Sequence, residues 1–570
     1  GTNNGFKGTV NGIGGTFDNL NEIQASTAPT DSLTGRNASA AFNLGATDQY
    51  VSVNTLDFSS FENLIGGNDV DIFNLSTNHS QNLAGGLGAD GFVFTGGAVL
   101  TGTVNGNGGL DALDFTGYGA SRSILLTGAG LTDGVIGSDS AISGGFTNID
   151  NLIGSSLAGD SLTGANLVAT YTFDNAGRHY TVSGKTTDFS AFEILNGGGL
   201  ADTFKFSGSG AYTGTLNGAG GPDKFDFTAF GSPVTLDLET ATVTGLTGTF
   251  SSIESVTGSS SSDTVIGPNA GANFNLTSAN AGNVNGAFTF TSVENLQGGT
   301  GTDSLNFSGF TGPVIVNLQN STATGLNGVF SNIEGMVGSS TSDTLIGLDA
   351  GNIFTISGVN SGNANGSFTF TSVENLTGAA GVDTFAFTGT GSLSGAVSGG
   401  TNTDVLDYSG YGSAMIFNLQ TQAATGLGSF NGIDTLVGSA FSDTILGPNA
   451  GTTFFITGSN AGTVAGLAFS SVENLTGGSG IDTIDYSLYP IGVTVNLLTQ
   501  LADGLSGAIT AIENIIGSLF DDILTGDNLV NTINGLAGTD LLTGNAGSDF
   551  YIFTDGWGID TVVETLAGGL

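Results

Sequence analysis

The chain has 570 residues, with 98 glycines, 49 acidic and 7 basic side chains, and a formal net charge of −42. All seven basic residues lie in the first 224, so we expect no nucleic-acid partner, because a phosphate backbone needs cationic side chains. The lack of cysteine excludes disulfides and thiolate metal sites. No apolar run is long enough to span a bilayer. With 39 phenylalanines and 38% hydrophobic residues, the chain is too apolar for disorder.

Residues 1–252 contain irregular repeats. Their marker is an apolar residue and an acid before a Gly turn, as in FENLIG from Phe61, IDNLIG from Ile149 and FEILNG from Phe192. These markers are 88 and 43 residues apart. We expect irregular solenoid coils here, because each repeat is too small to bury its own apolar face.

Residues 253–516 repeat more regularly. The same marker recurs from Ile253 to Ile512 at spacings of 40, 40, 40, 60, 39 and 40 residues. A second acid follows nine residues after the first, as Asp263 follows Glu254. Since one interval is longer by half a repeat, we interpret the half-repeat as one coil of the solenoid and the 40-residue repeat as two coils.

Residues 517–570 contain four nonapeptides without a gap, from Gly517 to Ile552. Each begins with Gly and has Asp or Asn at its sixth place, namely Asp522, Asn531, Asp540 and Asp549. Two nonapeptides make one 18-residue coil, which stacks Asp522 over Asp540 and Asn531 over Asp549. Stacked carboxylates repel unless a cation lies between them, and the turn carbonyls are free to bind a hard cation such as calcium.

This tail resembles the RTX, or haemolysin-type, calcium-binding nonapeptide GGxGxDxUx. Three upstream segments fit the same pattern: GGLGADGFV from Gly85, GGTGTDSLN from Gly298 and GGSGIDTID from Gly477. The resemblance implies calcium as the bound ion, a type I secretion route, an extracellular or cell-surface location and folding outside the cell once calcium is met.

The elements themselves are predicted to be short strands. Segments such as FTFTS and TVNLL alternate β-branched or aromatic residues with small ones, and Gly, Asn and Ser clusters separate them. Together with the strict spacing, this predicts an all-β fold: a right-handed parallel β-solenoid, of β-roll or β-helix type, with coils of about 18–21 residues.

The predicted metal ligands are the turn residues that stack on a neighbour. Besides the four tail residues, they include three pairs that are one coil apart and two acids from the complete nonapeptides: Asp90 with Asp111, Asp202 with Asp223, Asp383 with Asp404, then Asp303 and Asp482. The alternative is that each Asp only caps its tight turn through a backbone amide.

The acids of the V-E-N-L segments, Glu294, Glu374 and Glu473, are either a second ligand set or solvated strand positions. The neighbouring asparagines could form an inward hydrogen-bonded ladder. Aromatic pairs such as Tyr408 with Tyr411 and Tyr486 with Tyr489 are either core packing or sugar-stacking surfaces.

Catalysis has little support in the sequence. Paired carboxylates such as Asp111 with Asp114 occur, as in glycosidases, but they repeat in many copies, and no Lys, Arg or His follows Lys224. We therefore expect no enzyme but a calcium-stabilised structural protein: a matrix filament, a surface layer or an adhesin stalk. The alternatives are a calcium-binding module of a secreted enzyme and a carbohydrate-binding module.

The expected partners are calcium ions and either further copies of the chain or surface and matrix components. Neither end of the sequence resembles a polar cap, and Gly568 and Gly569 resemble the opening of another turn. This predicts either a longer parent chain or end-to-end stacking into a filament.

Overall fold

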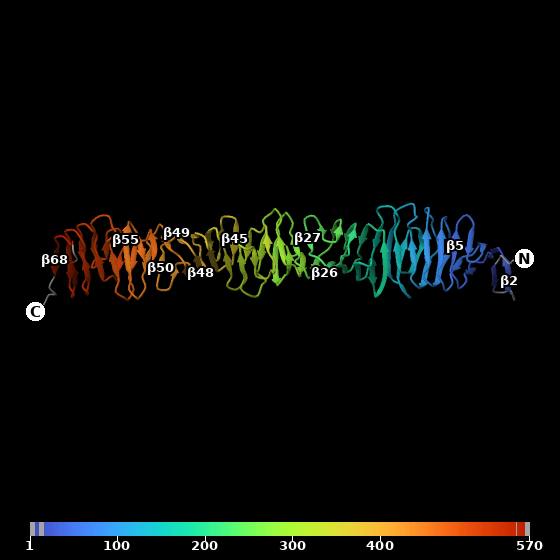
Figure 1. Cartoon of the computed structure of the whole chain (residues 1–570), viewed down its shortest axis with the longest axis horizontal. Coiled ribbons are helices and arrows are strands. Elements are labelled where there is room, and N and C mark those ends of the chain that lie inside the picture. Colours follow the sequence, from blue (N-terminus) through green and yellow to red (C-terminus); the bar gives the residue numbers. More distant parts are fainter. Residues whose placement is uncertain (1–5, 11–15, 554–555, 565–570) are drawn as a thin grey trace. The chain divides into compact units, whose positions relative to one another are not determined.

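The computed structural model describes residues 6–10, 16–553 and 556–564. These residues form strands from β1 (Phe6–Thr9) to β68 (Thr561–Glu564), and no α-helix occurs among them (Figure 1). Most strands pair in parallel with a strand from the next coil. The predicted all-β solenoid architecture is therefore confirmed. Gly568 and Gly569 lie outside the described residues.

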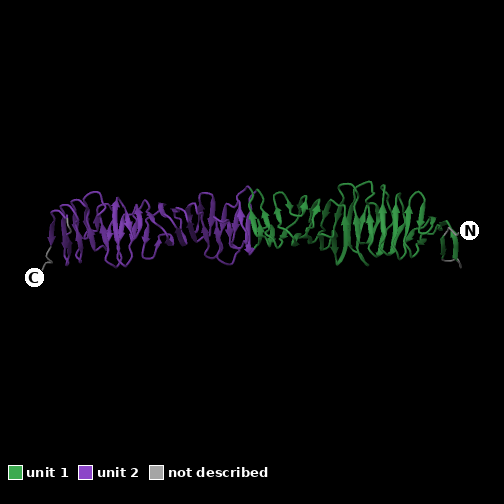
Figure 2. Cartoon of the chain, in the orientation of Figure 1, with its two compact units in different colours: residues 1–269, 280–299 green, residues 270–279, 300–570 purple. Residues whose placement is uncertain are grey.

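The strands form two compact units (Figure 2). Unit 1 comprises residues 1–269 and 280–299, and unit 2 comprises residues 270–279 and 300–570. In each unit the chain crosses back and forth between two ladders of strands. One such passage through both ladders is called a coil below.

Short coils of the predicted kind occur in unit 1. One ladder contains β8 (Asn63–Ile65), β10 (Asn82–Leu87) and β12 (Val104–Gly108), all parallel. The other contains β9 (Asp71–Leu75), β11 (Gly91–Phe94) and β13 (Ala112–Asp114). Phe73 pairs with Phe92 and Phe92 with Leu113, so each coil here has the length that the sequence predicted.

The tail, in unit 2, has shorter coils still. Strands β63 (Asn514–Ile516), β65 (Thr532–Asn534) and β67 (Phe550–Ile552) are parallel, with Ile515 next to Ile533 and Ile533 next to Tyr551. On the other ladder, Leu524 of β64 (Ile523–Thr525) pairs with Leu542 of β66 (Leu541–Asn545). Each step equals two nonapeptides, as the tail sequence predicted.

The 40-residue repeats are built differently from the prediction of two coils each. Strands β43 (Ile353–Gly358), β44 (Ser361–Ala364) and β45 (Phe368–Thr371) form an antiparallel meander on one ladder. The parallel steps around it are longer, as from Met336 to Phe370 and from Leu345 to Leu376. The extra residues are therefore a folded-back hairpin, and not a second coil.

A sequence signal for this meander exists. Asn365 and Gly366 have φ values of 54° and 69°, and the N–H of Ser367 donates to the carbonyl of Ala364. Positive φ at both central residues is the type I′ requirement, and Asn-Gly is its preferred sequence. The same dipeptide occurs at Asn285 and Gly286, again with positive φ at both residues. Repeat length alone does not distinguish such a meander from a second coil.

The core consists of aromatic and aliphatic stacks between the ladders. Phe42 lies 4.6 Å from Phe73, and Phe73 lies 5.0 Å from Phe92, measured between ring centroids. In unit 2, Phe387 stacks on Tyr408 at 4.6 Å. All five rings are completely buried, and burying each contributes roughly 2 kcal/mol. In-register stacking of equal side chains is what keeps successive coils aligned.

Candidate functional site

The acids that close the turns are buried. We call them turn acids: Asp71, Asp90, Asp111, Asp160, Asp202, Asp223, Asp263, Asp303, Asp343, Asp383, Asp404, Asp443, Asp482, Asp522 and Asp540. None of these side chains is more than 2% exposed. Ionised carboxylates are rarely buried without compensation, so each needs hydrogen-bond donors, a proton or a cation.

Backbone amides of the neighbouring coil supply part of that compensation. The N–H of Asp90 donates to Oδ1 of Asp111 (2.8 Å), and the N–H of Asp383 donates to Oδ1 of Asp404 (2.8 Å). The same bond joins three other predicted pairs: Asp202 to Asp223 (2.7 Å), Asp522 to Asp540 (2.9 Å) and Asn531 to Asp549 (2.8 Å). All five predicted pairs are therefore neighbours.

Twelve of the turn acids fall into two classes by their remaining contacts, and Asp71, Asp202 and Asp482 belong to neither. In each turn a glycine lies five residues before the acid, or six before Asp160, as Gly338 lies before Asp343. In the first class, called the Ser-type turns, the residue after this glycine is a buried serine. Its hydroxyl donates to the acid at 2.8–3.1 Å in five turns: Ser155 to Asp160, Ser259 to Asp263, Ser339 to Asp343, Ser439 to Asp443 and Ser518 to Asp522. The serine N–H also donates to the other carboxylate oxygen in the last four. These acids are fully hydrogen-bonded.

In the second class, here the Gly-type turns, no such serine is present and Oδ2 of the acid is buried without a hydrogen-bond partner. The acids are seven turn acids and the half-buried Asp549 at the same place of the last nonapeptide: Asp90, Asp111, Asp223, Asp303, Asp383, Asp404, Asp540 and Asp549. All eight are among the twelve ligands predicted from the sequence. The other four, Asp202, Asp482, Asp522 and Asn531, have partners for their side-chain oxygens.

A peptide carbonyl faces the unpartnered oxygen in these turns. A Cβ on Gly399 would lie 1.9 Å from the carbonyl oxygen of Gly432 and 2.5 Å from Oδ2 of Asp404. Gly218 leaves the same space between the carbonyl of Ser252 and Oδ2 of Asp223. Carboxylate and carbonyl oxygens are the ligands that calcium takes, so the residues of the Gly-type turns fit this ion.

Two turns have an asparagine in place of the acid, and its uncharged amide forms hydrogen bonds at the position where the carboxylate oxygen is otherwise unpartnered. Asn531 donates through Nδ2 to the carbonyl of Glu513 (3.1 Å). Asn352 donates to the carbonyl of Gly378 (3.0 Å) and to Oδ1 of Asp383 (2.7 Å). An amide nitrogen at this place binds the carbonyl that a carboxylate can only repel.

Burial changes the proton affinity of the turn acids. It raises the pKa of Asp90, Asp202, Asp223 and Asp540 to about 6. For Asp111, burial first and then the neighbouring carboxylates raise the pKa to about 7. At neutral pH the four acids with a pKa of about 6 are therefore mostly charged, and Asp111 is only partly so, because burial makes the charged form costly.

The V-E-N-L acids have a structural role that the sequence pattern did not indicate. Oε2 of Glu374 accepts the N–H of Asp343 (2.8 Å), and its Oε1 accepts Nδ2 of Asn360 (2.8 Å). Glu473 does the same for Asp443 and Asn460. In each of these bonds the two acids are 30 or 31 residues apart in the sequence. The sequence analysis considered only acids one short coil apart, so it did not predict these contacts.

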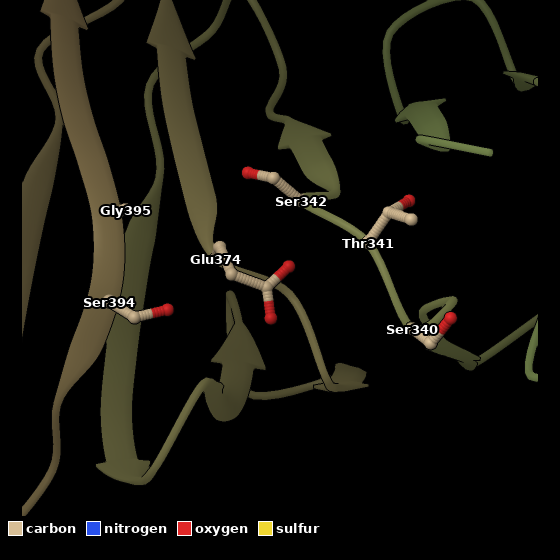
Figure 3. A pocket seen from close by; sticks show the side chains of 6 residues that line it. All are labelled: Ser340, Thr341, Ser342, Glu374, Ser394 and Gly395. Carbon is tan, nitrogen blue, oxygen red and sulfur yellow. The ribbon is translucent and has the colours of Figure 1, made fainter.

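Glu374 also lies in an open groove of about 380 Å³. Figure 3 shows its carboxylate between Ser394 on one strand and the loop of Ser340, Thr341 and Ser342. The adjacent Asn375 donates to the carbonyl of Asp343 (2.9 Å) and to the hydroxyl of Ser342 (2.9 Å). The asparagine therefore ties the turn down, and the predicted ladder from one V-E-N-L asparagine to the next does not form here.

The aromatic pairs belong to the core. Tyr408 and Tyr486 are completely buried, and their partners Tyr411 and Tyr489 pack edge-to-face on them at 5.4 and 5.5 Å.

The acids three residues after a turn acid have a local structural role. Each of these acids accepts a hydrogen bond from the backbone N–H two residues further on and so caps a turn. The four acids are Asp114, Asp226, Asp407 and Asp485.

A helix long and apolar enough to cross a membrane does not occur among the described residues. Comparison of the chain with protein-family models gives no match, and comparison with curated proteins gives no significant relative.

Proposed function

We propose that this chain is a calcium-stabilised structural repeat protein that serves as an extracellular scaffold, as a matrix filament, a surface layer or an adhesin stalk. The observation that carries the proposal is the set of buried, unpartnered carboxylate oxygens at the Gly-type turns. They recur from coil to coil, whereas a catalytic group is normally unique.

The residues that would hold calcium are the eight Gly-type acids together with carbonyls of the neighbouring coil. Calcium bound there would neutralise the carboxylates. A hydrogen bond from a backbone amide to Oδ1 of each acid fixes the carboxylate, so that Oδ2 is oriented toward the ion. Ion binding to the folded state alone stabilises it by mass action. A net charge of −42 opposes folding through self-repulsion, so the cation would matter for the whole chain.

The groove geometry supports a structural role as well. Two open hollows in the described residues have volumes of about 380 and 310 Å³. The larger hollow is lined by Ser340, Thr341, Ser342, Glu374, Ser394 and Gly395, without the apolar lining that is usual for a small-molecule site. Tyr408 and Tyr486 are buried, and the half-buried Tyr411 and Tyr489 pack edge-to-face on them, so core packing explains both pairs without a carbohydrate ligand.

The test is removal of calcium from the full chain. We expect the melting temperature and the β-sheet circular dichroism to fall after thorough chelation at pH 7.5, and to return with calcium but not with the same concentration of sodium. An unchanged melting temperature after chelation would refute the calcium part of the proposal. Negative-stain microscopy in millimolar calcium then tests the scaffold part, because a matrix or surface-layer protein should form filaments or arrays. A strictly monomeric particle would leave only the stalk.

A further inference from the structure

An insertion in unit 1 brings a loop to the turn acid Asp111. After β13 the chain crosses to the other ladder and forms an antiparallel meander of three strands, β14 (Ser123–Ala129), β15 (Val135–Asp139) and β16 (Ile142–Ile149), of which β16 is parallel to β12. It then returns at β17 (Asn151–Ile153), which pairs with β13 in parallel. The loop between β14 and β15 carries Asp133, and Asp150 lies between β16 and β17.

Three carboxylates converge at this place. Asp111, Asp133 and Asp150 each offer one oxygen, and the three oxygens lie within 4.8 Å of one another. No other group of three or more acidic or histidine side chains meets this condition among the described residues. The spacing of the turn acids predicted Asp111 as a ligand together with Asp90, but nothing in the repeat pattern pointed to Asp133.

Two of the converging side chains have oxygens without hydrogen-bond partners. Asp111 is 0% exposed and its Oδ2 is unpartnered, and Oδ1 of Asp133 is likewise buried and unpartnered. The other oxygens are held by backbone amides. Gly109 donates to Oδ2 of Asp133 (3.2 Å), Asp111 to Oδ2 of Asp150 (3.2 Å), and Asp90 to Oδ1 of Asp111 (2.8 Å). The amides therefore orient the carboxylates and leave one oxygen on each of two acids unused.

A carbonyl oxygen completes the oxygen set. A Cβ on Gly106 would lie 2.0 Å from the carbonyl oxygen of Asn148 and 2.3 Å from Oδ2 of Asp111. Both oxygens thus face one small space that exists only because residue 106 has no side chain. Asn148 is itself fixed, because its Nδ2 donates to Asn105 (2.8 Å) and its Oδ1 accepts the N–H of Thr132 (3.1 Å) from the loop.

The protein does not neutralise the three charges itself. The ammonium of Lys185 binds the loop at the carbonyl of Thr132 (2.6 Å). Among the described residues, it makes no ion pair with any of the three carboxylates. Three carboxylates this close repel one another strongly in a partly buried setting, so the arrangement favours a divalent cation.

We propose that Asp111, Asp133 and Asp150, with the carbonyl oxygen of Asn148, bind one hard divalent cation of the calcium class, which fastens the inserted β14–β15 loop to the parallel ladder. The site shares Asp111 with the Gly-type turns but takes a further ligand, Asp133, from an inserted loop, so it does not rest on calcium binding by the other seven Gly-type acids.

The test compares Asp133→Asn with Asp114→Asn in the full chain. Both changes remove one negative charge, but Asp114 lies on β13 outside the cluster, where its Oδ1 accepts the N–H of Thr116 (2.7 Å). After chelation, each protein is dialysed against calcium and the bound ions are counted by atomic emission. We expect one ion fewer per chain in Asp133→Asn and no change in Asp114→Asn. An equal count in Asp133→Asn and wild type would overturn the proposal.

Hydrogen exchange of the wild-type chain gives an answer that needs no variant. Calcium should slow exchange of the amides of residues 130–134, and in Asp133→Asn this calcium effect should be lost. Loop exchange in the wild type that saturating calcium leaves unchanged would also overturn the proposal, whatever the variant does. A parallel count on Asp404→Asn separates the two claims: if the Gly-type turns bind no calcium, that variant keeps the wild-type count while Asp133→Asn still loses one ion.

Discussion

The short parallel coils and the antiparallel meanders solve the burial of a turn acid in different ways. Where coils are short, successive acids stack directly and serine caps are rare. Except for Asp303, each Gly-type acid has a stacked neighbour 18 to 21 residues away, and a long step follows three of them, Asp111, Asp223 and Asp404. Where meanders lengthen the step, a serine hydroxyl, as from Ser339, donates to the turn acid, and a V-E-N-L acid, as Glu374, accepts the backbone N–H of that same acid. The difference teaches that the identity of one residue decides the outcome: Asp522 keeps its Ser518 cap even in a short coil, whereas the stacked acids with an unpartnered oxygen depend on something from outside the chain.

The largest expected effect is on local unfolding after chelation. At pH 7.5 without calcium, amide protection should collapse in the short-coil segments around residues 63–114 and 514–552, while the meander of residues 353–371 stays protected. Hydrogen exchange followed by mass spectrometry measures both in one sample. Uniform loss over all segments would remove the distinction between the two turn classes.

A second prediction concerns pH in the absence of calcium. Because burial raises the pKa of Asp90, Asp223 and Asp540 to about 6, the native state binds more protons than the unfolded state between about pH 4 and 6. Stability of the metal-free protein should therefore fall as pH rises through this window. Thermal melts from pH 4 to 8 measure this trend, and saturating calcium should flatten it. A metal-free protein that grows more stable across the window would contradict the unpartnered state of these acids.

A third prediction uses matched substitutions at two completely buried acids of unit 2. In Asp443→Asn, the new amide nitrogen must face donors from Ser439, so we expect a loss of about 1–3 kcal/mol with or without calcium. In Asp404→Asn, the amide can donate to the carbonyl of Gly432, as Asn531 does to Glu513. This variant should be as stable as wild type or more so without calcium, and should gain less from calcium. Denaturant melts with and without the ion compare them.

The smallest effect is expected at a meander turn. Gly366 has a φ of 69° and open space where a Cβ would lie, so Gly366→Ala should cost about 1–2 kcal/mol through backbone strain alone. The loss should be equal with and without calcium, since no turn acid is touched. A loss of stability in Gly366→Ala that depends on calcium would show that calcium binding stabilises the meanders as well as the short coils.

The sequence by itself determined the fold class, the positions of the turn acids and the pairs that stack. Strand alternation, glycine spacing and the regular intervals between turn acids are local features, and parallel coils repeat them without change. The sequence also contained the Asn-Gly signal of the meanders at Asn365, although the 40-residue repeat length suggested two short coils instead of a coil lengthened by a hairpin.

Only the tertiary structure decided which acids are saturated and which are not. Whether Oδ2 of Asp404 or of Asp443 finds a donor depends on one serine and on the step between coils, both of which act across neighbouring coils. The cluster of Asp111, Asp133 and Asp150 was equally invisible, because its members belong to three separate segments and meet only where an inserted hairpin folds back. Periodicity predicts what repeats, whereas a contact made by an insertion occurs once and leaves no period to detect.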